Sequence, residues 1–191
     1  MTVATPDLRP FAITDEKFWE LCVANPEMRL ERTAEGKVII MPPVAADTGA
    51  RNSEVTGQLW LWNRKTGLGK VFDSSAGFVL PNGAIRSPDS AWVRQERWDA
   101  LTRQEQSHFP PLSPDFVVEL RSRSDKLADA RNKMLEYIEN GARLGWLIDP
   151  KEQRVYIYRP NQAVEVLDDP ETVSGETVLP GFTLELGGIF T

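Results

Sequence analysis

The segment from residue 114 to residue 149 holds a helical pattern between two short apolar strands, and this order restricts the possible folds more than any other feature. The run Phe116-Val117-Val118 predicts a strand that is buried on both faces, and LGWLID at residues 144–149 predicts another. Between them, apolar residues recur at helical spacing over residues 125–140, and Gly141 ends the pattern. Since such strands need cover on both faces, the segment predicts an α/β fold with helices packed on a mixed β-sheet.

The rest of the chain is expected to extend this architecture at both ends. Helices are predicted from Thr14, as the N-terminal cap, to about Ala24, and from Thr48 to Lys65. Because no repeat or interdomain linker interrupts the pattern, residues 1–191 are expected to form one domain. Three hairpin turns are predicted, at Glu35-Gly36, Asn82-Gly83 and Pro160-Asn161.

Cysteine and histidine are too scarce for several kinds of active site. Cys22 is the single cysteine and His108 the single histidine, which excludes an internal disulfide, a histidine-rich metal site and an HNH-type nuclease site. No G-x-S-x-G sequence accompanies His108, so a Ser-His-Asp hydrolase is not indicated. No apolar run approaches the roughly 20 residues of a membrane span, and the N-terminal sequence lacks a signal pattern. A cytoplasmic location is therefore expected.

The net charge of −6 is unevenly distributed along the chain. Residues after Arg159 contribute six of the 28 acidic residues and none of the 22 basic ones. Residues 1–159 therefore carry 22 acidic and 22 basic residues, and the C-terminal part is acidic. A neutral body is compatible with DNA binding but lacks the basic character typical of DNA-binding domains.

Two acidic residues at strand positions are the strongest candidates for chemistry. Asp89 follows a proline at the start of a predicted strand, and Glu119 lies inside the predicted buried strand. If these strands are neighbours, the two carboxylates and the backbone carbonyl of Leu120 form the oxygen-rich pocket that Mg²⁺ prefers. A metal there lowers the pKa of a bound water and offsets charge on a phosphodiester. Residues 119 and 121 share one face of the strand, so Arg121 is expected close by.

Other interpretations of these residues remain open. A Pro-Asp pair is also ordinary turn chemistry, which is the preferred interpretation for Asp115. An acid inside FVVEL is costly unless it is paired or binds metal, so Glu119 could instead form a buried salt bridge with Arg121 or Lys133. Positive charges exceed negative ones by three over residues 121–133, which fits phosphate contacts or a solvated helix face. The tryptophans are mostly at core spacing, and none is interpreted as a base-stacking platform.

Four stretches of the sequence together resemble the bacterial Uma-type family of restriction endonucleases: RSPDSAW, PDFVVELRSRSD, KMLEYIENGARLGWLIDP and VLPGFTLEL. That family belongs to the PD-(D/E)XK nuclease superfamily and is abundant in cyanobacteria. The resemblance extends from about Thr14 to the C-terminus. It implies a restriction-endonuclease-like mixed sheet flanked by helices, with an N-terminal helix-hairpin extension and a C-terminal hairpin. It also implies that Asp89 is the superfamily aspartate and Glu119 the second acid.

One position departs from the superfamily pattern, which has lysine two residues after the second acid. Arg121 stands there, and arginine keeps its proton at neutral pH and cannot serve as a ready general base. Related sequences carry the lysine on the following helix, where Lys133 is the match and borders the buried stripe; Lys126 is the weaker candidate. Glu54, on the preceding helix, matches a carboxylate that some superfamily members use as an additional metal ligand.

The resemblance implies an endonuclease that hydrolyses DNA with Mg²⁺, or with Mn²⁺ as a substitute. Asp89, Glu119, Leu120 and Glu54 are then the candidate metal ligands. Lys133 is expected to stabilise or help activate the attacking water, and Arg121 to contact phosphate. A homodimer is expected, since related nucleases pair to cut both strands. The alternative is a nuclease fold without catalysis that serves as a nucleic-acid-binding or assembly module. Arg121 and the neutral body favour that alternative, and an RNA-processing enzyme is a third possibility.

Overall fold

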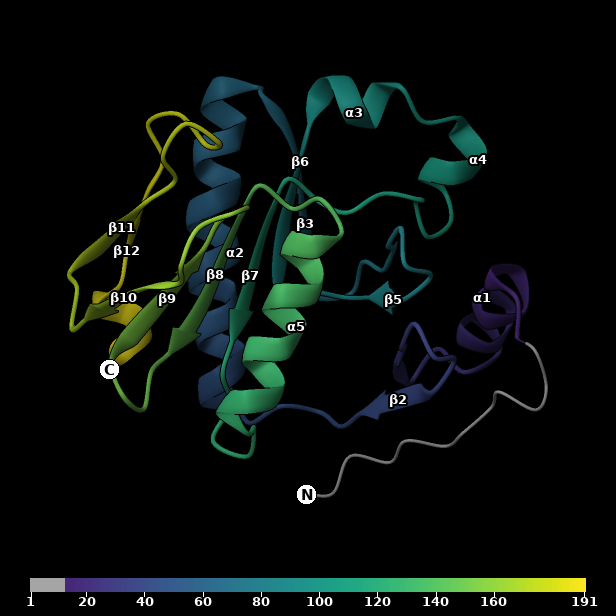
Figure 1. Ribbon diagram of the computed structural model, residues 1–191, viewed down its shortest axis with the longest axis horizontal. Coiled ribbons are helices and arrows are strands. Elements are labelled where there is room, and N and C mark those ends of the chain that lie inside the picture. The colour runs from purple at the N-terminus through teal and green to yellow at the C-terminus, as the bar shows by residue number, and fades with distance from the viewer. Residues whose placement is uncertain (1–12) are drawn as a thin grey trace.

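The computed structural model describes residues 13–191, and a six-stranded sheet forms its centre (Figure 1). Its spatial order is β10 (Glu165–Asp168), β9 (Arg154–Tyr158), β8 (Leu144–Asp149), β7 (Phe116–Leu120), β6 (Ser90–Arg94) and β3 (Gly69–Asp73). Strands β7 and β8 run parallel, and the other neighbouring pairs run antiparallel. A parallel pair needs a crossover connection, which α5 (Leu127–Glu139) supplies. The predicted mixed α/β sheet is confirmed.

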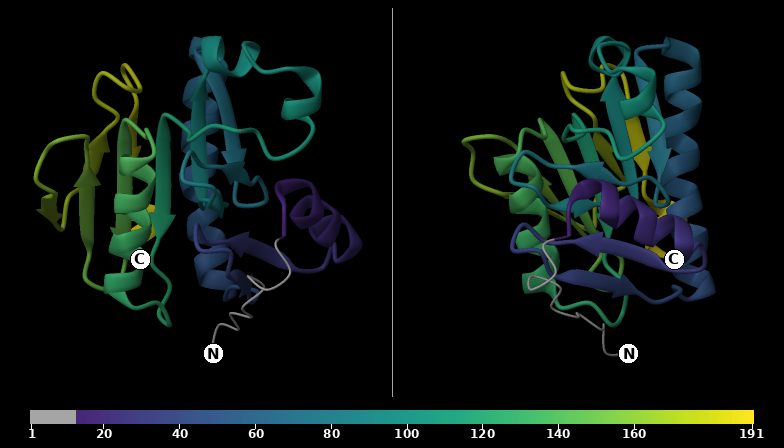
Figure 2. Two further views of the ribbon diagram at one scale, coloured as in Figure 1. Left: turned by 45° about the vertical axis from the view of Figure 1, so that its right-hand side comes forward. Right: turned by 90° about the vertical axis from the view of Figure 1, so that its right-hand side faces the viewer.

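Helices cover both faces of this sheet, as the apolar strands require. Helix α2 (Ala46–Thr66) lies on one face and α5 on the other, so the sheet forms the middle layer (Figure 2). On the α2 side, Val55 and Leu59 pack against Phe116 and Trp146. On the α5 side, Met134 and Tyr137 belong to the cluster that also contains Ala91, Val117 and Leu147. Burial of this core on both faces holds the strand that carries Glu119 in place.

A smaller sheet lies beside the central one and carries the N-terminal part of the chain. Its order is β2 (Val38–Met41), β1 (Arg29–Arg32), β5 (Ile85–Arg86) and β4 (Phe78–Val79). Helix α1 (Asp15–Ala24) packs on it through Phe18, which is fully buried together with Ile85. This sheet is the expected helix-hairpin extension, and β5 joins it to the strand that begins after Asp89.

The remaining elements complete the edges. Helices α3 (Gln95–Asp99) and α4 (Arg103–Gln106) connect β6 to β7. Strands β11 (Thr172–Ser174) and β12 (Thr183–Glu185) form the C-terminal hairpin, and α6 (Gly187–Phe190) follows it. The C-terminal hairpin and α6 pack on the α2 side of the central sheet, because Leu184 and Ile189 belong to the same core cluster as Val55 and Leu59 of α2.

The local signals in the sequence placed most boundaries correctly. Gly36, Gly83 and Asn161 occupy the predicted turns with φ of 81°, 83° and 57°, the left-handed region that glycine and asparagine tolerate. Helix α5 begins at Leu127, later than predicted, because the chain first makes a turn in which Asp125 accepts a hydrogen bond from the amide of Ser122. Gly141, with φ of 105°, follows the end of this helix as expected.

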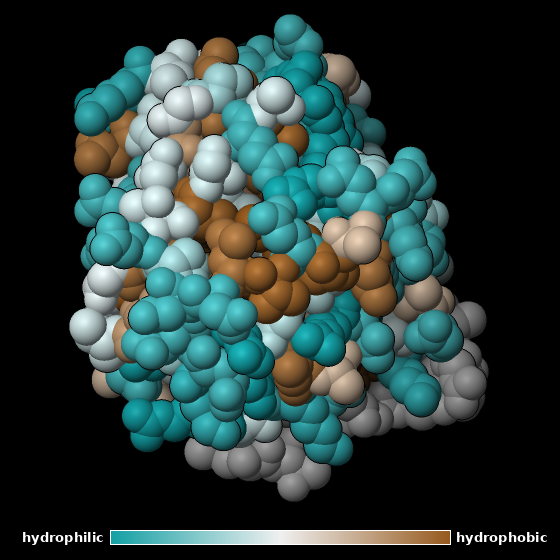
Figure 3. All heavy atoms as spheres, turned by 60° about the vertical axis from the view of Figure 1, so that its left-hand side comes forward, coloured by the Kyte–Doolittle hydropathy of each residue, from teal (hydrophilic) through white to brown (hydrophobic). Residues whose placement is uncertain are grey.

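The outer surface on the β10 side is mainly hydrophilic, with an irregular apolar patch near its middle (Figure 3). Strand β10 forms the edge of the central sheet and carries Glu165 and Asp168, and charged side chains on an edge oppose pairing with further strands. Within residues 13–191, no helix has both the length and the apolar composition of a membrane span.

Candidate active site

Asp89 and Glu119 lie next to each other where two neighbouring strands meet. Strands β6 and β7 pair antiparallel with Ser90 opposite Val118 as the last pair, and Asp89 directly precedes β6 while Glu119 follows Val118 in β7. The Asp89 carboxylate accepts a hydrogen bond from the amide of Leu120, and its charge adds to the rise in the pKa of Glu119. The two acids are therefore neighbours, with Asp89 in contact with Asn52 of α2 and Glu119 in contact with Lys133 of α5.

Main-chain and side-chain donors hold the Asp89 carboxylate. Its Oδ2 accepts a hydrogen bond from the amide of Leu120 at 2.9 Å, and its Oδ1 accepts one from Asn52 Nδ2 at 3.3 Å. Burial raises the pKa of Asp89, and the Leu120 amide opposes that effect only in part. The backbone of Leu120 thus lies beside Asp89.

Lys133 reaches the site from α5, on the face that this helix turns to the sheet. Its Nζ lies 2.8 Å from Glu119 Oε1 and 2.8 Å from Glu31 Oε1. Although burial alone would lower the pKa of Lys133, the two carboxylates outweigh it and raise the pKa above its ordinary value. Lys133 is therefore a permanently protonated cation between two acids.

Glu31 and Arg86 support this arrangement from the smaller sheet. Glu31 is only 2% exposed and accepts hydrogen bonds from Arg86 Nη1 at 3.2 Å and from the amide of Ser87 at 3.0 Å. Arg86 also donates to Glu136 of α5 at 2.6 Å. Glu31 and Arg86 could not be singled out from the sequence, because charged side chains in short hairpin strands such as MRLER ordinarily face solvent.

The charges of this cluster do not cancel. The acids Glu31, Asp89, Glu119 and Glu136 face the bases Arg86 and Lys133, and Arg29 lies near Asp89, which leaves one negative charge when all seven are ionised. Burial raises the pKa of Glu119 to about 7; Lys133 counteracts the rise, whereas Asp89 and Glu31 add to it. A divalent cation beside Asp89 and Glu119 would offset this excess.

The donor set fits a hard cation that keeps part of its water shell. The hydrogen bonds to Glu119 from Tyr137 and Lys133 both use Oε1, so among residues 13–191 its Oε2 has no hydrogen-bond partner. No cluster of three or more His, Cys, Asp or Glu side chains suited to a metal occurs in that range. Mg²⁺ is commonly bound through one or two carboxylates with several waters retained, whereas a structural Zn²⁺ site needs a full protein ligand set. The residues present therefore fit Mg²⁺ or Mn²⁺.

The structure does not bring Arg121 to the carboxylates. Its Nη1 lies 2.5 Å from Oδ2 of Asp149, which is fully buried, and its Nε donates to the carbonyl of Asp125. A buried carboxylate needs a cation as a partner. Asp149 is the last residue of β8, and Arg121, directly after β7, supplies that cation. Arg121 was expected beside Glu119, and the structure pairs it with Asp149 instead.

Glu54 also lies away from the site. Residues two apart on a helix point about 200° apart, so Asn52 meets Asp89 while Glu54 faces the C-terminal segment. Glu54 accepts a hydrogen bond from Gln58 and lies near Gly188 of α6. Among the described residues, Asn52 and not Glu54 is therefore the α2 side chain that contacts Asp89. The weaker lysine candidate, Lys126, is the exposed N-cap of α5.

Asp115, the other Pro-Asp aspartate, has a structural role that goes beyond a turn. Its side chain is buried; Oδ2 accepts a hydrogen bond from the amide of Arg94 at 2.9 Å and lies 3.0 Å from Arg97 Nη1. It ties the start of β7 to the end of β6, which helps to fix the register that brings Asp89 next to Glu119.

A mixed sheet that joins an aspartate and a glutamate from neighbouring strands to a lysine is a restriction-endonuclease-like fold. The chain belongs to the Uma2 family, whose model, described as "Putative restriction endonuclease", matches residues 15–187. It is also similar to a solved structure from Anabaena variabilis, described as a putative nuclease belonging to DUF820. The two chains are 25% identical with a TM-score of 0.76, over 93% of this chain and 97% of the other. A comparison with curated proteins finds no match.

The raised pKa of Glu119 predicts a pH-dependent stability when divalent metals are chelated. Between its ordinary pKa of 4.5 and about 7, the folded state holds a proton that the unfolded state has lost. The free energy of unfolding should therefore fall as pH rises through this window, by up to roughly 3 kcal/mol. Urea unfolding of the wild type and of Glu119→Gln at several pH values measures this, since the difference between the two isolates Glu119. A pH-independent difference would contradict the prediction.

Proposed function

We propose that this protein is an endonuclease that hydrolyses DNA phosphodiester bonds with a divalent metal ion. The observation that carries the proposal is the pair of neighbouring carboxylates, Asp89 and Glu119, with the Lys133 ammonium against one of them. Membership of the Uma2 family and the similarity to a structure described as a nuclease support it. Asp89, Glu119 and the backbone carbonyl of Leu120 are the proposed ligands of Mg²⁺ or Mn²⁺.

Such a metal lowers the pKa of a bound water and offsets negative charge on a phosphodiester. The chain itself would fix where this chemistry takes place. The Leu120 amide and Asn52 hold the Asp89 carboxylate in one orientation, while Tyr137 and Lys133 hold Oε1 of Glu119. Held in this way, the ligands need little reorganisation when the substrate binds.

Lys133 is proposed to act as a cation and not as a general base, because its raised pKa keeps it protonated. Its ammonium can donate a hydrogen bond to the attacking water or to a phosphate oxygen, which stabilises the negative charge that develops on the oxygens of the reacting phosphate. Glu31 holds Lys133 from the opposite side and so limits the freedom of a long side chain.

A basic hollow next to the site offers contacts for the nucleic-acid backbone. It has a volume of about 430 Å³ and is lined by Arg51, Arg121, Arg123 and Lys151 together with Pro150. Arg123 is highly exposed, with 85% of its side chain accessible. Arg121 pairs with Asp149, and Arg51 and Arg123 share Asp47, so these two acids offset part of the positive charge around the hollow. Cations of this kind bind phosphates without reading sequence. A phosphate contact in this hollow stays the role proposed for Arg121.

Metal binding should raise the thermal stability of the wild-type protein. At a hundredfold excess over the dissociation constant, a ligand specific for the folded state stabilises it by about 2.7 kcal/mol. That corresponds to a rise in Tm of roughly 5–11 °C for a chain of this size. Melting curves in Mg²⁺, in Mn²⁺ and in chelator measure it, and a nicking assay on supercoiled plasmid with the same additions tests the activity directly.

The rival is a nuclease fold without catalysis that serves as a binding or assembly module. The pairing of Lys133 with both Glu119 and Glu31 favours it, because a purely structural ion cluster would show the same contacts. Equal melting curves with and without metal, and intact plasmid in every sample, would support that module and contradict the nuclease. That residues 1–191 form one domain, and that the protein is a homodimer, both stay predictions whichever of the two functions is correct.

A further inference from the structure

A groove extends along one side of α2 and includes Asp89 in its lining. Its volume is about 570 Å³, and α2, β1 and the turn after β3 form its walls. On α2 the lining includes Asn52, which contacts Asp89, and Trp60, eight residues further on. With a rise of 1.5 Å per residue, the two positions are about 12 Å apart along the helix. The groove therefore connects the candidate metal ligand with a region about two helical turns away.

The helix leaves open space at Gly57, which lies between these two positions. A β-carbon added to Gly57 would meet no atom within 4 Å, so no neighbouring part of the chain requires a glycine here. Glycine inside a helix costs about 1 kcal/mol relative to alanine. The same holds for Gly49, which also lines the groove. This face of α2 is therefore open at both glycines.

Trp60 presents its ring to this groove and to solvent. It is 50% exposed, whereas Trp62, Trp92 and Trp146 are buried in the core as the spacing predicted. The guanidinium carbon of Arg64 lies 5.2 Å from the centre of the Trp60 ring, which places a positive charge beside it. An exposed aromatic ring with an arginine is the combination that proteins use to stack unpaired nucleobases.

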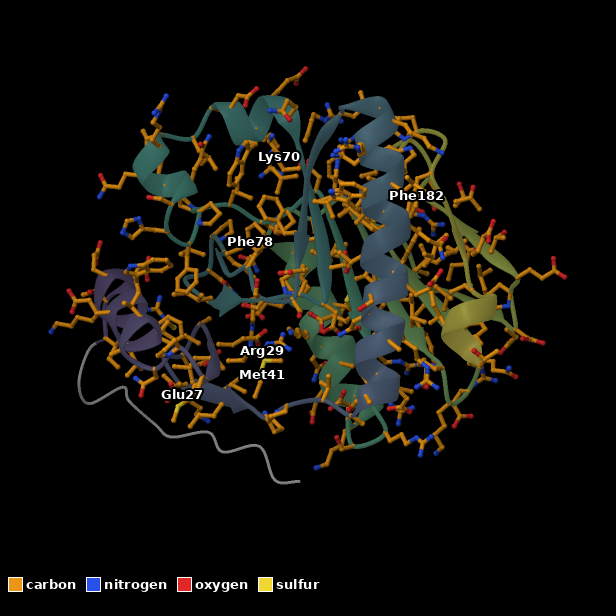
Figure 4. All side chains as sticks on the ribbon, turned by 180° about the vertical axis from the view of Figure 1, so that it is seen from behind. Glu27, Arg29, Met41, Lys70, Phe78 and Phe182 are labelled. Carbon is orange, nitrogen blue, oxygen red and sulfur yellow. The ribbon has the colours of Figure 1, made fainter. Side chains whose placement is uncertain are left out.

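Arg29 brings a cation into the groove from β1. Figure 4 shows it on the side of the smaller sheet that faces α2. Its Nη2 donates to the carbonyl of Ser74 at 2.9 Å, and among residues 13–191 no carboxylate lies within ion-pair distance of it. The groove also contains Asp73, but that carboxylate accepts two hydrogen bonds from Ser75 in a local turn. Arg29 is thus available for a phosphate next to Asp89.

We propose that this groove binds an unpaired stretch of a nucleic-acid strand, with a nucleobase stacked on Trp60 and a phosphate held by Arg29. The inference rests on the proposed function and adds a substrate class to it: nucleic acid with single-stranded character next to the scissile bond. A paired base in a duplex has both faces covered by its neighbours, so only an unpaired base can use the ring of Trp60. The open face of α2 at Gly57 gives the strand room to reach Asp89.

The test is fluorescence anisotropy with fluorescein-labelled oligothymidylate and with a labelled duplex of the same length, in chelator so that cleavage does not interfere. The wild type should bind the single strand more tightly than the duplex. Trp60→Ala should weaken single-strand binding by roughly 10- to 100-fold, the range expected for loss of one stacked base. Gly57→Leu should weaken it as well, because the new side chain fills the groove, while its Tm should not fall. Trp60→Phe should retain most of the binding.

Leu61→Ala is the matched control, since Leu61 is also 50% exposed on α2 but does not line the groove. Its affinity should equal that of the wild type, and labelled oligouridylate distinguishes DNA from RNA. Unchanged single-strand binding in Trp60→Ala and Gly57→Leu, or tighter binding of the duplex by the wild type, would overturn the inference even if metal-dependent nicking is found. Loss of binding in both variants without any nicking would uphold the groove and overturn the nuclease.

Discussion

Asp89→Asn and Glu119→Gln should each lower the rate of metal-dependent cleavage by at least about a thousandfold. Each substitution removes one of the two neighbouring carboxylates at the proposed metal site, and with it half of the side-chain charge available to a divalent cation. The metal-induced rise in Tm should be lost with the activity. Conversion of supercoiled to nicked plasmid over time, and melting curves with and without Mg²⁺, measure the two effects.

Both variants should remain folded, which makes the loss of activity interpretable. The pKa of Glu119 is raised to about 7, so the site already tolerates its neutral form, and glutamine has the same shape. In Asp89→Asn, the new side chain can still accept the hydrogen bond from the Leu120 amide. In the wild type, Oδ1 of Asn52 is buried and has no hydrogen-bond partner among the described residues. If the side-chain amide of Asn52 flips, this oxygen can accept a hydrogen bond from the amide group introduced at position 89. In chelator, Tm should therefore equal or exceed that of the wild type. Nicking at the wild-type rate by either variant would exclude these residues as the metal ligands.

Lys133→Met should lower the free energy of unfolding by about 3 kcal/mol, equivalent to a fall in Tm of roughly 6–12 °C. Removal of one partner from a buried ion pair leaves the other charge without compensation. Here Glu119 loses a cation at 2.8 Å, and so does Glu31, which keeps Arg86. Because Glu119 can take up a proton instead, the loss should be smaller at pH 5 than at pH 8. Cleavage should disappear as well.

Lys126→Met is the matched control for this substitution. Lys126 is exposed at the N-cap of α5, so its removal should change stability by less than about 0.5 kcal/mol and leave nicking intact. The double variant Lys133→Met with Glu119→Gln should recover part of the lost stability, since it removes one of the uncompensated charges. Equal urea midpoints for Lys133→Met and Lys126→Met would show that the cluster around Lys133 does not stabilise the fold.

The sequence predicted the elements whose signals are local. The apolar run at residues 116–118 marked a strand covered on both faces, and helical spacing marked α2 and α5, because the side chains that define each period lie within a few residues of one another. Turns at Gly36, Gly83 and Asn161 followed from the backbone conformations that these residues tolerate. The start of α5 was placed too early, since the turn at Ser122–Asp125 depends on one side-chain hydrogen bond that no periodicity reveals.

Some residues of the candidate site could be identified from local sequence signals, whereas the contacts of others depend on segments that are far away in the chain. Asp89 and Glu119 could be singled out because an acid beside a buried strand is costly without a partner. Arg121 and Glu54 were misplaced for one common reason: a strand or helix period states which side a residue faces, but not which segment packs there. Asp149 meets Arg121 from the next strand, and the C-terminal helix meets Glu54.

By itself the sequence determined the α/β class, the strands and turns, and the two acids that the fold brings next to each other. Only the tertiary structure decided that Glu31, 102 residues from Lys133, holds that lysine from another sheet. It also decided that Trp60, on the same helix as the buried Trp62, faces an open groove. The physical reason is that burial and ion pairing depend on distances between segments remote in the chain, which packing sets and short-range periodicity does not encode.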